Sequence, residues 1–134
     1  MSAINATALA RSILRQLIEA GVEDFVLSPG SRNAPLSIAL HEAHVKGLIN
    51  LHIKIDERGA GFFGLGIAQA TRKYVALICT SGTAAANYHP AALEAYHSGT
   101  KLLFVTADRP ARLRGTGANQ TTIQNGLLSP IQTI

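Results

Sequence analysis

The chain has 134 residues, of which 47% are hydrophobic and 15% are charged, and its net charge is +4. A disordered segment needs low hydrophobicity and high net charge, so this composition excludes one and predicts a single globular domain. Charged residues make up about 25% of an average soluble protein. The low value here predicts a domain with much of its surface covered in a larger assembly.

The charge pattern and the single cysteine exclude several kinds of site. Arg109, Arg112 and Arg114 form a local cluster, but Lys-rich runs are absent and there are only three Tyr and four Phe. A nucleic-acid surface combines basic and aromatic residues, so none is predicted. The arginine cluster instead favours small anions such as carboxylates. Cys79 excludes a disulfide framework and is predicted to be a buried, inert thiol within the apolar run 74–79.

No export signal or membrane span is predicted. Arg11 and Arg15 interrupt the first apolar stretch, where a signal peptide would need an unbroken apolar core. The long uncharged run 74–93 contains polar breaks at 80–83 and 87–90. We therefore expect a cytoplasmic protein without a membrane partner.

Hydrophobic periodicity predicts helices that alternate with strands. Leu9, Ile13 and Leu17 form the apolar stripe of a predicted helix. Asn5 can cap the start of this helix, and Gly21 can end it. Strands alternating with helices imply parallel βαβ units, so the fold class is α/β, a doubly wound, mainly parallel sheet with helices on both faces. The predicted strands are 24–28, 51–55, 74–79 and 102–106. The further predicted helices are about 33–46, 58–70 and 83–98, and Pro90 is expected to kink the last of them. Residues 107–122 are predicted to be irregular.

Polar residues follow all four predicted strands. They are small, hydroxyl-bearing or charged, and they occupy positions 28–32, 56–58, 80–83 and 107–110. Ligands of open parallel sheets bind beyond the carboxyl ends of the strands, so the pattern predicts a functional edge. The alternative is that these loops are polar only because they are loops.

Two local motifs suggest chemistry that we do not favour. Residues 59–64 match the G-x-G-x-x-G pattern, but a dinucleotide site also needs an acidic residue about 20 positions later, and no Asp or Glu lies between Arg58 and Leu93. We expect these glycines to allow close helix packing. Ser81 lacks the G-x-S-x-G context of a hydrolase nucleophile, although the amides that follow it could hold a polar ligand.

Glu57 is the candidate acid–base residue. It ends a predicted strand and precedes Gly, Ala and two Phe, so apolar surroundings would favour its neutral form. A carboxylic acid of that kind can share a proton with a heterocyclic nitrogen. The alternative is a structural glutamate paired with Arg58.

Five motifs, taken together and in order, resemble the N-terminal pyrimidine-binding domain of the 2-succinyl-5-enolpyruvyl-6-hydroxy-3-cyclohexene-1-carboxylate synthase family, the thiamine-diphosphate enzymes of menaquinone biosynthesis. The resemblance covers nearly the whole chain, and Asn33 and Gly59 are its small departures. The motifs are SPGSRNAPL at 28–36, DERGAGFF at 56–63, CTSGTAAAN at 79–87, TADRP at 106–110 and GANQT at 117–121.

The resemblance implies a role for each matching position. Glu57 would bond the pyrimidine nitrogen of thiamine diphosphate and drive the cofactor to its imino form, which generates the ylid that attacks 2-oxoglutarate. Carbon dioxide would leave and the product would add to isochorismate. The cofactor-side residues would be Pro29, Gly30, Thr80, Gly82 and Asn87 beside Glu57; the substrate-side residues would be Ser31, Arg32, Arg109, Asn119 and Gln120, whose arginines suit dicarboxylates.

The same resemblance implies that residues 1–134 are one domain of a longer enzyme. The diphosphate and its Mg²⁺ would lie on a separate domain with a Gly-Asp-Gly motif, and no Gly-Asp pair occurs here. The active site would form between subunits of a homodimer or homotetramer, so the isolated chain is expected to be inactive. Two alternatives stay open: another thiamine-diphosphate decarboxylase, similar to acetolactate synthase, and a catalytically silent binding module of the same fold.

Overall fold

The computed structural model describes residues 5–129, and helices and strands alternate along this part of the chain. The elements are α1 (Ala6–Glu19), β1 (Asp24–Leu27), α2 (Ala34–Val45), β2 (Asn50–Ile53), α3 (Glu57–Thr71), β3 (Val75–Cys79), α4 (Thr83–Asn87), α5 (His89–Ser98), β4 (Leu102–Thr106) and the short 3₁₀ helix η1 (Ala111–Leu113). No helix within residues 5–129 is long and apolar enough to cross a membrane.

The four strands form one parallel sheet in the order β2-β1-β3-β4. Leu27 at the end of β1 lies between Ile53 of β2 and Ile78 of β3. The carboxyl ends of all four strands therefore meet at one edge. From β1 the chain moves to β2 on one side and then returns to β3 on the other, so the order reverses between β1 and β3. A crevice at such a reversal is the usual ligand site of a doubly wound sheet.

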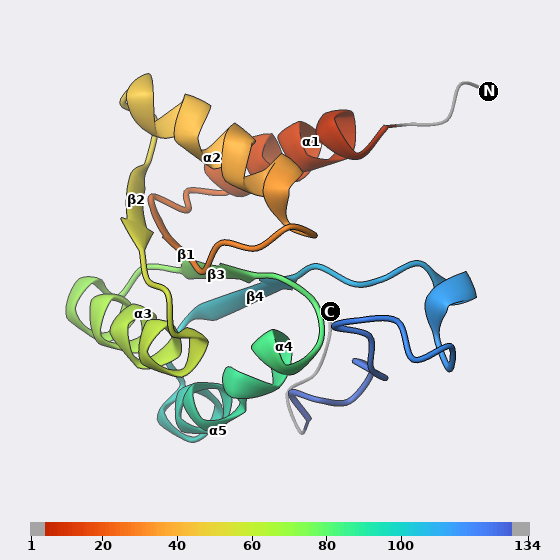
Figure 1. Ribbon diagram of the computed structural model, residues 1–134. Helices are drawn as coiled ribbons and strands as arrows, with labels where there is room; N and C mark the ends of the chain where they lie inside the picture. The colour runs from red at the N-terminus through yellow and green to blue at the C-terminus, as the bar shows by residue number, and fades with distance from the viewer. Residues whose placement is uncertain (1–4, 130–134) are drawn as a thin grey trace.

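Helices cover both faces of the sheet, as the sequence predicts (Figure 1). On one face, Leu14 of α1 and Leu40 of α2 pack with Phe25 and Ile78 of the sheet. On the other face, Ala60 of α3 and Ala85 of α4 pack with residues of the sheet that include Val26, Leu77 and Cys79. The two layers of helices explain why β3 is buried along its whole length.

The first helix is capped as predicted, but its buried stripe is shifted. The Asn5 side chain accepts a hydrogen bond of 2.8 Å from the amide of Ala8, which satisfies a donor of the first turn. Ala10 and Leu14 face the core, whereas Leu9, which we placed on the apolar stripe, is half exposed. The apolar face is broad enough for tertiary packing to select this neighbouring stripe.

The prediction of one kinked helix over residues 83–98 is wrong. The chain forms two helices, α4 and α5, that meet at Tyr88, and Pro90 lies in the first turn of α5. Proline has no amide proton, so it suits a helix start better than a helix interior. The fully buried Tyr88 ring lies 5.6 Å from the Phe104 ring of β4, which fixes the junction against the sheet.

The glycines of the G-x-G-x-x-G pattern allow close packing of α3, which confirms that prediction. A Cβ atom at Gly61 would lie 2.9 Å from Cβ of Ala91 in α5, and one at Gly64 would lie 2.5 Å from Cδ2 of Leu77 in β3. Both approaches are too short for a real side chain. The pattern therefore places α3 against its neighbours.

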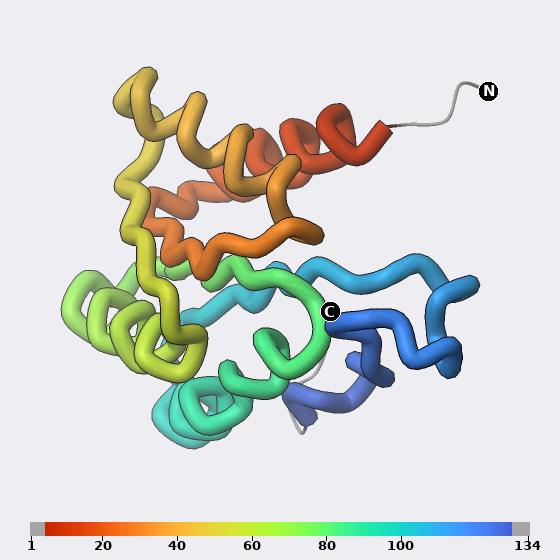
Figure 2. The backbone as a smooth tube through the Cα atoms, in the orientation of Figure 1, coloured from red at the N-terminus to blue at the C-terminus, as the bar shows by residue number. Residues whose placement is uncertain are grey.

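Residues 107–129 contain no helix or strand other than the 3₁₀ helix η1, in keeping with the irregular stretch predicted over 107–122. This segment leaves β4 and folds back beside the turn that joins β3 to α4 (Figure 2). The return brings the last predicted motif, at 117–121, to the carboxyl edge of the sheet.

Candidate functional site

The site is centred where β1 and β3 end side by side. Gly30, in the loop after β1, lies so close to Thr80, after β3, that a Cβ atom on Gly30 would be 2.6 Å from Cβ of Thr80. The side chain of Asn33 donates a hydrogen bond of 3.0 Å to the carbonyl oxygen of Ser28 and closes the first of these loops. Two sequence motifs that are 50 residues apart thus form one surface.

Glu57 lies at the same edge, but it does not end a strand as the sequence suggested. It is the first residue of α3, and Asp56 caps the helix by accepting a hydrogen bond of 2.6 Å from the amide of Gly59. The alternative pairing of Glu57 with Arg58 is not formed, since no ion pair between residues 5 and 129 includes Glu57. The side chain is half-buried, so the apolar enclosure that we expected is incomplete within this chain.

Three buried polar side chains lie behind Glu57. Burial, with a smaller contribution from the nearby Glu57 carboxylate, raises the pKa of Cys79 to about 12. Burial also raises the pKa of Tyr88 above its ordinary value, with smaller contributions from Cys79 and Glu57, while the Ser28 hydroxyl counteracts them. The Cys79 thiol is buried and protonated, as the sequence predicted. Sequence reasoning missed Tyr88, because its proximity to Ser28 and Cys79 depends on the fold.

Several buried polar atoms at this edge have no hydrogen-bond partner within residues 5–129. They come from the loops after β1, β3 and β4 and from the α4–α5 junction, so they share one region of the fold. A buried polar group without a partner costs about 1–3 kcal/mol. Their clustering is therefore typical of a surface that awaits a ligand or another part of the protein. The atoms are Ser28 Oγ, Arg32 Nε, Asn33 Oδ1, Thr80 Oγ1, Tyr88 OH and Arg109 Nε.

The three arginines of the cluster differ in their contacts. Arg114 forms an ion pair of 2.6 Å with Asp108, and the other oxygen of Asp108 accepts a hydrogen bond of 2.7 Å from the amide of Arg109. Arg112 is exposed on η1. Arg109 instead reaches Gln120, with 3.4 Å between Nη2 and Oε1. Of the three, only Arg109 joins the predicted substrate-side residues.

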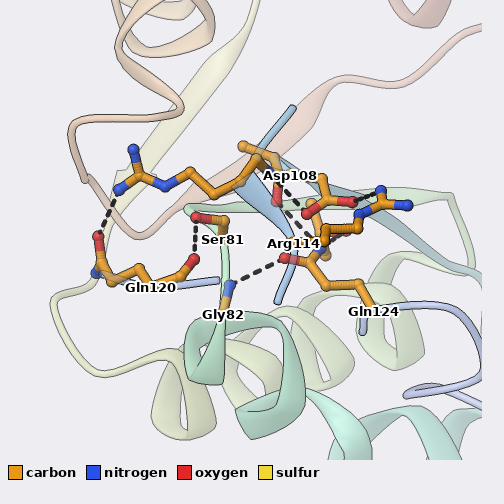
Figure 3. A network of polar contacts seen from close by, with 9 residues as sticks. Ser81, Gly82, Asp108, Arg114, Gln120 and Gln124 are labelled. Carbon is orange, nitrogen blue, oxygen red and sulfur yellow. Dashed lines mark hydrogen bonds and ion pairs between the residues drawn. The ribbon is translucent and has the colours of Figure 1, made fainter. Parts of the chain in front are cut away.

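A polar network ties the segment after residue 117 to the turn after β3 (Figure 3). The Ser81 hydroxyl donates a hydrogen bond of 2.8 Å to the carbonyl oxygen of Gln120. The Gly82 amide donates one of 2.9 Å to Oε1 of Gln124. This amide, which we expected to be available to a ligand, is thus already paired within the chain. Sequence reasoning missed Gln124, and the only signal for it was its place just after the last motif.

The other predicted residues are at the edge of the site or turned into the chain. Pro29, Ser31 and Asn119 are exposed. The Asn87 side chain donates a hydrogen bond of 3.0 Å to the carbonyl oxygen of Thr83, so in this chain it is held against its own helix. Their predicted contacts with cofactor or substrate stay predictions.

Comparison with known proteins identifies the family. Residues 7–128 match the model of the thiamine pyrophosphate enzyme, N-terminal TPP binding domain. The chain belongs to this family. TPP is thiamine diphosphate under its other common name, so the match confirms both the α/β fold class and the cofactor type that the motifs implied.

Several curated relatives similar to this TPP-binding domain carry the same name. The domain is 59% identical over 127 residues to the 2-succinyl-5-enolpyruvyl-6-hydroxy-3-cyclohexene-1-carboxylate synthase of Nocardioides sp., over 95% of the chain and 24% of that relative. It is 57% identical to the synthase of Saccharopolyspora erythraea, over 88% of the chain and 21% of the relative. It is 55% identical to the synthase of Thermobifida fusca, over 90% of the chain and 21% of that relative. The chain thus spans less than a quarter of each relative.

The residues of the TPP-binding domain fit one side of the cofactor. Within residues 5–129 Glu57 offers a carboxylate free of ion pairs, and unpartnered buried polar atoms come from the loops after β1, β3 and β4. Within the described range, 5–129, no group of three or more His, Cys, Asp or Glu could hold a metal ion. Carboxylate, hydroxyl and guanidinium groups of this kind can form hydrogen bonds with the polar atoms of an organic ring.

Proposed function

We propose that this chain is the pyrimidine-binding domain of a 2-succinyl-5-enolpyruvyl-6-hydroxy-3-cyclohexene-1-carboxylate synthase. The enzyme would decarboxylate 2-oxoglutarate and add the resulting succinyl unit to isochorismate in menaquinone biosynthesis. The observation that carries the proposal is the placement of Glu57 and Arg109 at one edge of the sheet, beyond the ends of β2 and β4. The shared name of relatives that are 55–59% identical supports the choice of reaction.

Glu57 would hold a proton between its carboxylate and a pyrimidine nitrogen. Asp56 already caps the amides of the first turn, so the Glu57 carboxylate is left free for a ligand. TPP, when bound, would supply the electron sink that a 2-oxo acid needs in order to lose carbon dioxide. A positioned acid–base group of this kind contributes about 10²–10⁴-fold to a rate.

The remaining cofactor-side residues would shape the place for the pyrimidine ring. Pro29 and Gly30 lie in the loop after β1, while Thr80 and Gly82 belong to the turn after β3 and Asn87 ends α4. Thr80 Oγ1 is buried and has no partner within residues 5–129, so it can bond a polar atom of the ring. The small size of Gly30 lets the two loops close on each other.

Ser31, Arg32, Arg109, Asn119 and Gln120 would bind the substrates. Arg32 Nε and Arg109 Nε are shielded from solvent and lack partners within the described residues, so each guanidinium retains a donor for a carboxylate. Charge-assisted bonds from a planar guanidinium to a carboxylate are the strong class of hydrogen bond. Both proposed substrates are dicarboxylates, which gives each arginine an anion to bind.

The rest of the active site would come from outside this domain. Mg²⁺ and the diphosphate would lie on another domain of the enzyme. The half-buried Glu57 would be covered by a second subunit in a homodimer or homotetramer. We also propose a cytoplasmic location, because Arg11 and Arg15 interrupt the first apolar stretch.

The test is an assay of the enzyme that carries this domain, with TPP and Mg²⁺ added. We expect carbon dioxide release from 2-oxoglutarate that depends on isochorismate. The mass of the product should equal the mass of isochorismate plus that of succinic semialdehyde, which is 2-oxoglutarate less carbon dioxide. Release from pyruvate in preference to 2-oxoglutarate would instead support a different thiamine-diphosphate decarboxylase. No turnover with any 2-oxo acid, despite bound TPP, would support a catalytically silent module.

A further inference from the structure

Gln120 has an unusual backbone conformation in the middle of the predicted substrate-side motif. Its φ is +52°, in the left-handed region that residues other than glycine seldom adopt. Such a conformation costs on the order of 1–3 kcal/mol and persists only where surrounding contacts hold it. The contacts that hold Gln120 therefore indicate how this part of the site is built.

Two neighbours act on Gln120 directly. The Ser81 hydroxyl donates a hydrogen bond of 2.8 Å to the Gln120 carbonyl oxygen, and Arg109 Nη2 lies 3.4 Å from its side-chain Oε1. Gly82 permits the approach, because a Cβ atom at this position would lie 3.1 Å from the backbone Cα and carbonyl carbon of Gln120. The turn after β3 is thus shaped to receive the backbone of Gln120.

Gln124 holds the same segment four residues further along. Its Oε1 accepts the hydrogen bond of 2.9 Å from the Gly82 amide, while its Nε2 donates one of 3.1 Å to the carbonyl oxygen of Ala107 and lies 3.5 Å from Thr106 Oγ1. Both ends of the side-chain amide are therefore used. One side chain links the end of β4 to the turn after β3, and Figure 3 shows it between these two backbones.

We propose that Gln124 is a positioning residue for substrate recognition. By holding the returning segment against Gly82 and Ala107, it keeps Gln120 in its left-handed conformation, with the Gln120 side chain beside Arg109. The pair Arg109–Gln120 then presents a preformed surface to a substrate carboxylate. This inference rests on the proposed function, since it assumes that Arg109 and Gln120 bind a dicarboxylate.

The link through Gln124 predicts which kinetic constant changes when it is lost. Gln124 forms no hydrogen bond with Glu57 or Arg109 within residues 5–129, so proton transfer at Glu57 should not depend on it. Arg109 itself stays in place, because Asp108 accepts a hydrogen bond from its amide. Loss of the clamp should weaken substrate binding and leave the chemical step intact.

The experiment compares Gln124→Met with wild type in the enzyme that carries this domain. Met has a similar volume but neither accepts from Gly82 nor donates to Ala107. We expect the KM for at least one of 2-oxoglutarate and isochorismate to rise about tenfold, as the loss of one or two hydrogen bonds implies, while kcat at saturating TPP stays within about twofold. Gln124→Glu keeps the acceptor but loses the donor, so its KM should be intermediate.

Two controls separate positioning from general stability. Asn125→Ala changes the adjacent exposed residue and should leave KM unchanged. Hydrogen exchange of the peptide 117–126, measured on the enzyme without cofactor, should be faster in Gln124→Met only. A lowered melting temperature with unchanged KM in Gln124→Met would overturn the proposal and leave Gln124 a structural brace.

Each remaining outcome also decides the matter. If Gln124→Met does not fold, Gln124→Glu tests the same role by a smaller change, since it loses only the donor to Ala107, and an unchanged KM in that variant would overturn the proposal. If wild type shows no turnover of 2-oxoglutarate with isochorismate, the proposed function fails, and the positioning role for substrate fails with it. Turnover by wild type with no change of KM in the variants refutes the positioning role alone.

Discussion

The side-chain amide of Asn33 donates a hydrogen bond of 3.0 Å to the carbonyl oxygen of Ser28, and Asn33 is 1% exposed. The bond closes the loop 28–33 between β1 and α2, on which four of the predicted site residues lie. Asn33 is also the position where the sequence departs from the expected motif. The departure thus coincides with a bond that shapes the loop.

Removing this bond should destabilise the fold. Asn33→Ala leaves a buried carbonyl without its partner, and we expect the free energy of unfolding to fall by about 1–3 kcal/mol. Urea unfolding of the chain measures the change. Asn50→Ala is the matched control, since Asn50 is exposed and should change stability by less than about 0.5 kcal/mol. Equal effects of the two substitutions would contradict the role given to Asn33.

Two glycines of α3 should respond in opposite directions to alanine. Gly61→Ala places a Cβ atom 2.9 Å from Ala91, whose own methyl group cannot rotate away, so we expect a loss of about 1–3 kcal/mol. Gly66 has no atom within 4 Å of the equivalent position. Gly66→Ala should therefore stabilise the helix by up to about 1 kcal/mol. Thermal unfolding of both variants checks the pair, and stabilisation by both would refute the close approach of α3 and α5.

Cys79 should make the stability of the chain depend on alkaline pH. Its pKa is about 12 in the folded state against an ordinary pKa of 9.0, so above pH 9 the unfolded chain has lost a proton that the folded chain keeps. The unfolded state then binds fewer protons, and stability falls as pH rises, by up to about 1.4 kcal/mol per pH unit from this group. Below pH 9 the contribution of Cys79 is complete and constant.

Cys79→Ala isolates this effect from that of other titrating groups. The difference in unfolding free energy between wild type and variant should be constant from pH 7 to 8.5 and should shrink from pH 9 upward. Urea unfolding at each pH supplies the difference. A difference that does not change with pH would show that the Cys79 thiol is not buried as described.

Glu57→Gln should separate proton transfer from binding in the enzyme that carries this domain. Glutamine keeps the shape and hydrogen-bonding capacity of the side chain but cannot exchange a proton with the pyrimidine nitrogen. We expect thiazolium proton exchange to slow and turnover to fall by about 10²–10⁴-fold, with a much smaller change in cofactor affinity. Normal proton exchange in this variant would make Glu57 a structural acid.

Arg109→Ala is the comparison for this experiment. It removes a guanidinium that no acidic side chain between residues 5 and 129 pairs with. The KM for a carboxylate substrate should rise while thiazolium proton exchange stays normal. Loss of thiazolium proton exchange in Arg109→Ala would contradict the assignment of Arg109 to the substrate side and Glu57 to the cofactor side.

The isolated 134-residue chain should be inactive and should bind TPP weakly or not at all. Most of the binding energy for so charged a ligand comes from its phosphates and metal, and residues 5–129 contain no group of three or more metal-ligating side chains. Calorimetry with TPP and Mg²⁺ tests this expectation. Micromolar affinity of the isolated chain would contradict it.

The sequence by itself determined the order of helices and strands, because each depends on local patterns. The strand over residues 102–106 has the predicted bounds, and Asn5 caps α1 as predicted, since apolar periodicity and capping involve residues within one or two turns. The polar motifs after each strand are also local patterns, so the sequence alone predicted a functional edge. The direction of parallel strands then places all four ends together without further information.

Only the tertiary structure decided which loops touch. The strand order β2-β1-β3-β4 brings Gly30 against Thr80, and the return of residues 117–129 brings Gln124 to Gly82. Packing of Tyr88 against β4 divides the predicted long helix in two. These contacts join residues that are 16 to 50 positions apart along the chain. No local pattern encodes them, because their free energy comes from burying surfaces that meet only after the sheet has formed.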